Sequence, residues 1–141
     1  MARTRLLQWL SWIMGVACVA IGVVHLCTGM ASVPGAESSG VSGATVDSLV
    51  RFFSAIFLGY GLAWIWVARQ SPIPSKGVRL LAGIFLLGGV SRLASWAAEG
   101  RPDGFQLVLM AIELALPPVY FWLSTAGERE SAAGKREPVM S

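Results

Sequence analysis

Four long apolar runs, separated by short polar segments, dominate the hydrophobicity pattern of this chain. The runs cover about residues 6–30, 47–68, 78–99 and 105–124. A helix of about 20 apolar residues spans the hydrocarbon core of a bilayer, so each run is long enough to cross a membrane. The pattern predicts an all-α fold, an integral membrane four-helix bundle within a single domain at residues 1–124. The polar tail at 125–141 is predicted to be disordered.

The segments between the runs contain residues that end helices and form turns. Residues 31–46 are rich in Gly, Ser and Ala, the prolines of SPIPS end the second run, and GRPDG turns the chain back into the fourth. A cleaved signal peptide is an alternative reading of the first run, because Arg3 and Arg5 precede it. The run is longer than the usual apolar region of about 7 to 15 residues, which favours a membrane helix.

Composition and charge support the membrane reading and predict its orientation. The chain has 141 residues, of which 55% are hydrophobic and 13% are charged, too apolar for an ordinary soluble domain. The net charge of +3 does not come from a basic patch with interleaved aromatic residues, so we expect no nucleic-acid partner. Basic residues concentrate on one side of the predicted spans, and the opposite side has only Arg101. This asymmetry predicts a multi-pass protein of the cell membrane with both termini cytoplasmic. The basic residues of the cytoplasmic side are Arg3, Arg5, Arg69, Lys76, Arg79, Arg129, Lys135 and Arg136.

Two arginines, Arg51 and Arg92, fall within or at the edge of the apolar runs. A guanidinium inside a membrane costs several kcal/mol unless it faces a protein interior, a wet cavity or an opposite charge. Helical spacing places small and polar residues of each run on one face, so these faces should meet inside the bundle. We predict that these charges are paired across helices, Arg92 with Glu113 and Arg51 with Asp47 or its neighbours. The four faces are Ser11, Gly15, Cys18, Gly22, His25 and Gly29; Asp47, Arg51, Ser54, Ala55 and Gly59; Gly88, Arg92, Ser95 and Glu99; and Gln106, Met110, Glu113, Pro117, Tyr120 and Ser124.

The depth of these side chains predicts where they gather. At about 1.5 Å of rise per residue, His25, Asp47, Arg51 and Arg92 all fall in the outer half of the membrane, and Glu113 lies about 13 Å below the outer turn. We therefore expect a polar cavity, open toward the outer leaflet and lined by His25, Arg51, Arg92 and Glu113. Prolines after Glu113 remove helical hydrogen bonds and predict a local kink that would open this region.

Three segments together resemble a known protein family. They are VDSLVRFFSAIFLGYGLAWIW around Arg51, LLAGIFLLGGVSRLASWAAEGRP around Arg92 and IELALPPVYFW around Glu113. Their combination is similar to the DUF4345 domain family, small bacterial membrane proteins, over about residues 10–124. The resemblance implies a four-helix membrane domain and implies no activity.

Several kinds of chemistry are not supported by the residues of this chain. One His and two Cys cannot form a usual zinc site, and Cys18 and Cys27 are about 13 Å apart on one helix, too far for a disulfide. The sequence contains no nucleophile elbow, P-loop or dinucleotide fingerprint. We therefore expect neither a metal nor a cofactor.

Two functional hypotheses of different classes follow from the polar residues. In the first, Asp47, Arg51, Arg92 and Glu113 are structural ion pairs or bind a lipophilic or amphiphilic ligand, such as a membrane lipid or a lipophilic small molecule. In the second, the protein is an intramembrane enzyme of the isomerase or cyclase type, with Glu113 and His25 as candidate acid/base residues acting on a lipid-like substrate. The sequence does not decide the oligomeric state or the identity of the ligand.

Overall fold

Within the residues that the structure describes, the fold is four long helices and one short 3-10 helix. The computed structural model describes the backbone of residues 2–35 and 43–134, and all of their side chains except 126, 127 and 129–134. The elements are α1 (Ala2–Thr28), η1 (Gly29–Ser32), α2 (Ala44–Ala68), α3 (Ser75–Glu99) and α4 (Gly104–Gly134). Four of these segments are long and apolar enough to span a membrane. The predicted all-α bundle of four membrane-spanning helices is therefore confirmed.

The ends of the helices differ from the predicted runs at several points. α2 begins at Ala44 and α3 at Ser75, each three residues before the predicted start. The larger difference is at α4, which runs unbroken through Pro117 and Pro118 and continues past Ser124 to Gly134. The first part of the predicted disordered tail is therefore helical, because it contains good helix formers and no proline before position 138. The rest of the predicted tail, 135–141, lies outside the described residues.

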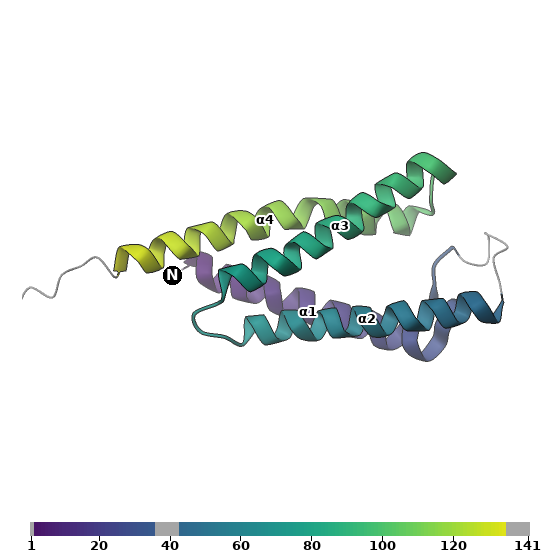
Figure 1. Ribbon diagram of the computed structural model, residues 1–141, viewed down its shortest axis with the longest axis horizontal. Helices are drawn as coiled ribbons and strands as arrows, with labels where there is room; N and C mark the ends of the chain where they lie inside the picture. The colour runs from purple at the N-terminus through teal and green to yellow at the C-terminus, as the bar shows by residue number, and fades with distance from the viewer. Residues whose placement is uncertain (1, 36–42, 135–141) are drawn as a thin grey trace, which may run out of the picture.

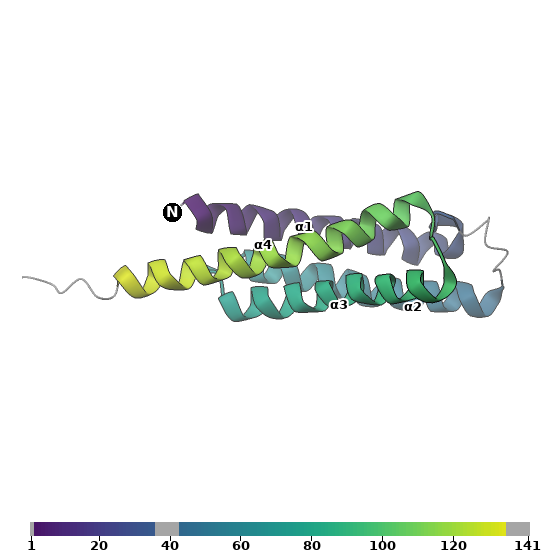
Figure 2. The same ribbon diagram turned by 90° about the horizontal axis from the view of Figure 1, so that it is seen from above.

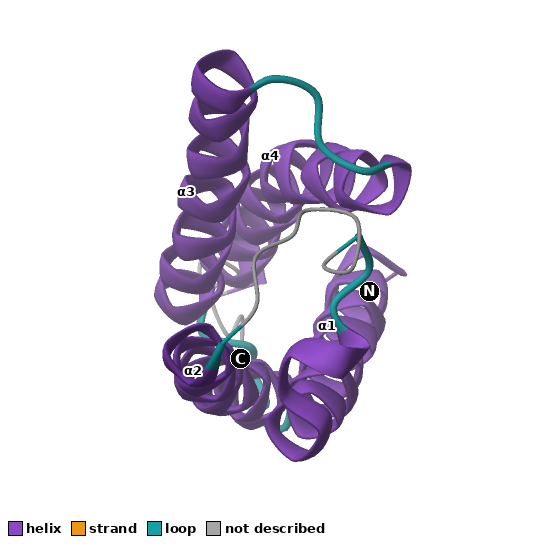
Figure 3. Ribbon diagram, turned by 90° about the vertical axis from the view of Figure 1, so that its right-hand side faces the viewer, coloured by secondary structure: helices purple, strands orange, loops and turns teal. Residues whose placement is uncertain are grey.

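The four helices lie along one common axis as two antiparallel hairpins, α1–α2 and α3–α4 (Figures 1 and 2). We call the end where α1 begins and α4 ends the termini end, and the opposite end the distal end. Figure 3 looks at the distal end and shows each helix beside its neighbours in the chain, with α4 next to α1. In Figure 1 the α3–α4 hairpin leans away from α1–α2 toward the distal end.

The hydrophobic core that joins the two hairpins lies in the half of the molecule nearest the termini. The ring of Tyr120 packs against that of Trp64 at a tilt of 39°, with 4.6 Å between ring centroids, and the Tyr120 hydroxyl donates to the carbonyl of Leu10 at 2.9 Å. The hydroxyl of Tyr60 donates to the carbonyl of Leu81 at 2.6 Å, which ties α2 to α3. The buried residues of this core are Leu7, Met14, Cys18, Trp64, Val67, Val78, Leu81, Ala82, Tyr120 and Leu123. The core thus holds the hairpins together at the termini end and stops short of the distal half.

Within the first hairpin, glycines bring α1 and α2 into backbone contact. A Cβ atom added to Gly61 would lie 2.7 Å from the Val19 nitrogen and 2.9 Å from the Gly15 carbonyl oxygen. One added to Gly22 would lie 2.9 Å from the nitrogen of Leu58. Small residues allow such close approach between membrane helices, where dispersion contacts replace the hydrophobic effect. These glycines therefore fix the α1–α2 hairpin independently of the polar side chains.

Candidate functional site

The first polar group at the distal end, which we call the Asp47 cluster, consists of Asp47, Arg51, His25, η1 and the end of α1. Arg51 Nε lies 2.7 Å from Asp47 Oδ2, one helical turn earlier in α2. Arg51 Nη1 also donates to the carbonyls of Leu26 at 2.7 Å and Cys27 at 3.2 Å. The last carbonyls of a helix lack helical partners and lie at the negative end of its dipole. Arg51 therefore caps α1 while it pairs with Asp47.

The short helix η1 folds back onto this cluster because Gly29 permits a sharp change of direction. Gly29 has φ +58°, and a Cβ atom there would collide with Asp47 Oδ1. Asp47 Oδ1 accepts a hydrogen bond from the backbone nitrogen of Met30 at 2.9 Å. The Ser32 hydroxyl donates to the Gly29 carbonyl at 3.0 Å and lies 2.6 Å from His25 Nδ1. Because the Ser32 hydroxyl already donates its hydrogen to the Gly29 carbonyl, its oxygen can only accept from His25. We therefore assign the imidazole hydrogen to Nδ1, which leaves Nε2 as a hydrogen-bond acceptor.

The second polar group, which we call the Arg92 cluster, joins α3 to α4 through Arg92, Gln106 and Glu113. Arg92 Nε lies 2.8 Å from Glu113 Oε2, and Arg92 Nη1 donates to Gln106 Oε1 at 2.6 Å. The Glu113 side chain is 12% exposed and that of Arg92 is 39% exposed. Gly89 lets α3 approach α4 closely at this point, since a Cβ atom there would lie 3.1 Å from the backbone carbon and the Cβ of Glu113. Glu113 Oε2 is buried and accepts no well-aligned hydrogen bond within the described part of the chain, so its contact with Arg92 is an ion pair by distance.

Gln106 links the Arg92 cluster to the segment that follows η1. Its side-chain amide donates to the carbonyl of Pro34 at 3.5 Å, the upper limit for such a bond. The other end of the same amide accepts from Arg92. A polar chain thus crosses the distal end from the second hairpin to the segment between α1 and α2.

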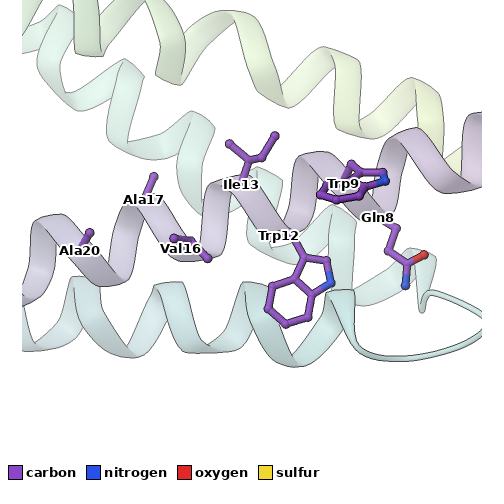
Figure 4. A pocket seen from close by; sticks show the side chains of 7 residues that line it. All are labelled: Gln8, Trp9, Trp12, Ile13, Val16, Ala17 and Ala20. Carbon is purple, nitrogen blue, oxygen red and sulfur yellow. The ribbon is translucent and has the colours of Figure 1, made fainter.

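The structure brings together some of the site residues predicted from the sequence and keeps others apart. Arg51 lies with Asp47, and Arg92 with Glu113. Among the described contacts none joins His25 or Arg51 to Arg92 or Glu113, so these residues form two groups and not one. A hollow of about 750 Å³ lies elsewhere, on α1 toward the termini end, and shares no lining residue with either cluster (Figure 4).

Several partners in these clusters were not predicted from the sequence. These unpredicted contacts are those of Arg51 with the carbonyls of α1, of Asp47 with the backbone nitrogen of Met30, and of His25 with Ser32. Backbone partners cannot be recognised from residue type, but a glycine such as Gly29 at the end of an apolar run is a signal of a sharp helix end. Within the described residues no group of three or more His, Cys, Asp or Glu side chains could hold a metal ion.

Comparison with known proteins gives one match. A family model described as "Domain of unknown function (DUF4345)" matches residues 6–124, which includes both clusters and all four spans. No curated protein and no solved structure matches the chain.

Proposed function

The chain belongs to the DUF4345 family, a family of unknown function, and we propose that it is a membrane protein that binds an amphiphile between its two hairpins in the distal half. The ligand would have an anionic or hydrogen-bonding head group held at Arg92 and an apolar part lying between the hairpins. We further propose that the protein resides in the cell membrane with both termini cytoplasmic, because of the asymmetry of its basic residues.

The main support for this proposal is that the contacts of Arg92 engage only some of its hydrogen-bond donors. A guanidinium has five N–H donors, and the described contacts of Arg92 engage Nε and one donor of Nη1. Arg92 lies within a membrane span, about two turns before the end of α3. Unsatisfied donors are costly in hydrocarbon, so the remaining ones require water, a lipid head group or a ligand. An anionic head group would form charge-assisted hydrogen bonds there.

The distribution of the core supports a place for the apolar part of the ligand. The buried apolar cluster that joins the hairpins is confined to the half near the termini. In the distal half the polar contacts lie within each hairpin: Arg51 of α2 donates to carbonyls of α1, and Arg92 of α3 pairs with Glu113 of α4. An acyl or isoprenoid chain between α2 and α3 would bury apolar surface that protein side chains leave uncovered there.

The enzyme hypothesis receives less support from the same geometry. The Glu113 carboxylate lies 2.8 Å from Arg92 Nε and is engaged in this ion pair, so it is not free to face a substrate as an acid or base. His25, the other candidate acid/base residue, donates to Ser32 and belongs to the Asp47 cluster. Because the two candidates do not share one cluster, ligand binding is the function that the site supports better.

Mass spectrometry of lipid extracts from the detergent-purified protein tests the proposal. We expect the wild type to retain one amphiphile that Arg92→Gln loses about tenfold, the effect of one charge-assisted hydrogen bond. Glu113→Gln should retain the amphiphile at least as well, because Arg92 is then freed from its carboxylate. Arg101→Gln, an exposed arginine of the α3–α4 connection, is the matched control and should change nothing.

Three results would overturn the proposal. The first is a wild-type protein that retains no amphiphile. The second is equal retention by Arg92→Gln and the wild type. The third is an equal loss in Glu113→Gln and Arg92→Gln with both variants folded by circular dichroism, since a purely structural ion pair predicts that symmetry.

A further inference from the structure

The outward face of α1 contains a hollow that neither polar cluster explains. Seven side chains of α1 line it, and Figure 4 shows them along one face of this single helix. Trp9, Ile13 and Val16 are 68%, 61% and 54% exposed, so the hollow opens to the surroundings of the bundle. Its volume of about 750 Å³ lies within the range of small-molecule sites, about 300 to 1,000 Å³. The lining residues are Gln8, Trp9, Trp12, Ile13, Val16, Ala17 and Ala20.

The length of the hollow fits a lipid chain from one leaflet. From Gln8 to Ala20 the helix rises about 18 Å, close to the half-thickness of about 15 Å of a hydrocarbon core. Ala17 and Ala20 form a low floor at the deep end, and larger side chains border it toward the termini end. A hollow of this shape would accommodate an extended acyl chain along the helix.

Along this face of α1 the residues change from charged to aromatic to small and apolar, in the same order as the head group, interfacial region and acyl chain of a phospholipid. Arg5 is exposed and lies one helical turn before Trp9 on the same face, and no contact is described for it. Gln8 donates to the carbonyl of Ala68 at 3.1 Å, and the exposed Arg69 directly follows this last residue of α2. The neighbouring Arg3, in contrast, lies over the ring of Trp122, at 5.0 Å from its centroid. Two exposed arginines, Arg5 and Arg69, therefore lie near the Gln8 end of the hollow in the chain, the tryptophans follow along α1, and the alanines lie at the other end.

We propose that this face of α1 binds one anionic phospholipid of the leaflet at the termini end. The phosphate contacts Arg5 and Arg69, the interfacial region lies against Trp9, and an acyl chain covers Ala17 and Ala20. Charge favours this occupant over a second copy of the chain, because a symmetric contact through this face would bring like-charged arginines together. The site differs from the proposed amphiphile site in helix, leaflet and end of the bundle.

Competitive lipid retention tests this site. The full-length protein is equilibrated in micelles with equal amounts of phosphatidylglycerol and phosphatidylcholine, and the retained lipids are measured by native mass spectrometry. We expect the wild type to prefer phosphatidylglycerol about tenfold, since each basic residue near an anionic lipid contributes to binding. The double variant Arg5→Gln/Arg69→Gln should lower this preference to near unity.

A second variant fills the hollow without changing the charge. Ala17→Leu/Ala20→Leu should lose both retained lipids and remain folded, because both alanines are exposed on the helix surface. Ala111→Leu, an exposed alanine of α4, and Arg101→Gln should behave as the wild type. Arg92→Gln should also leave this preference unchanged, which separates this test from that of the amphiphile site.

The proposal fails if the wild type retains both lipids equally, or if Ala17→Leu/Ala20→Leu retains as much phosphatidylglycerol as the wild type. Either result would show annular lipid only. A dimer that persists in native mass spectra without bound lipid, and that Ala17→Leu/Ala20→Leu dissociates, would assign the face to a second copy and also overturn it.

Discussion

Removing the charge of Arg92 should destabilise the protein more than removing that of Glu113. Breaking a buried ion pair typically costs about 3 to 5 kcal/mol, and an exposed one costs under about 1 kcal/mol. The Glu113 side chain is only 12% exposed, but the 39% exposure of Arg92 requires a discount. We therefore expect Arg92→Gln to lower the free energy of unfolding by about 2 kcal/mol, because it leaves the mostly buried Glu113 carboxylate uncompensated. Glu113→Gln should cost about 1 kcal/mol, because Arg92 keeps its bond to Gln106.

The double variant Arg92→Gln/Glu113→Gln isolates the interaction between the two residues. Both charges are then absent, so its cost should be smaller than the sum of the single costs by about 1 kcal/mol. This value lies within the range measured for polar interactions between membrane helices, about 0.6 kcal/mol on average and up to about 1.7.

Unfolding by sodium dodecyl sulfate in mixed micelles, followed by far-ultraviolet circular dichroism, provides the free energies. Arg101→Gln is the control and should lie within about 0.5 kcal/mol of the wild type. The reasoning is refuted if the costs of the two single variants add without coupling, or if each is below about 0.5 kcal/mol.

Further substitutions and one fusion experiment test other parts of the structure. Gly29→Ala should destabilise the protein by about 1 to 2 kcal/mol in the same titration, because φ at this residue is +58° and the new Cβ would collide with the Asp47 carboxylate. Gly83→Ala is the control and should be neutral or stabilising, because nothing lies within 4 Å of the added Cβ. Gly61→Ala should lower the free energy of unfolding by more than about 2 kcal/mol, because the added Cβ separates α1 from α2. Gly59→Ala is the control, since nothing lies within 4 Å of its added Cβ, and an equal cost for the two variants would contradict the close packing at Gly61. Gln106→Leu should speed amide hydrogen exchange in η1 and the residues after it, whereas unchanged exchange there would show that the long bond at 3.5 Å contributes nothing. Reporter fusions at both ends should report a cytoplasmic location, and an external signal from either end would refute the charge-based orientation.

The number of helices and the pairing partners were accessible from the sequence for simple reasons. A span needs about 20 apolar residues, so four such runs predict four helices with little ambiguity. Polar residues inside these runs are few, and helical spacing places Arg92 and Glu113 on faces that must meet within a bundle. Because few other polar residues lie inside the spans, Glu113 was the natural partner to predict for Arg92, and the two residues form an ion pair in the structure.

The grouping of the site residues could not be predicted in the same way. Helical spacing shows which face a residue occupies, but every polar face points inward alike. Which faces meet depends on the crossing of the helices and on where the core is packed, and here the core ends before the distal half. His25 and Glu113 consequently belong to separate clusters. The backbone partners of Arg51 have no signature in residue type, so this contact became visible only in the structure.

The two clusters impose different demands during synthesis of the chain. Arg51 finds its partners in α1 and in its own helix, all of which precede it in the chain and are synthesised before it. Arg92 instead depends on Gln106 and Glu113 of α4, which are translated later. At about 5 to 20 residues per second, the arginine waits about 1 to 4 s for the carboxylate. α3 therefore reaches the insertion machinery with an unpaired charge, and its stable entry into the bilayer should be delayed until α4 emerges and the two helices insert as one unit.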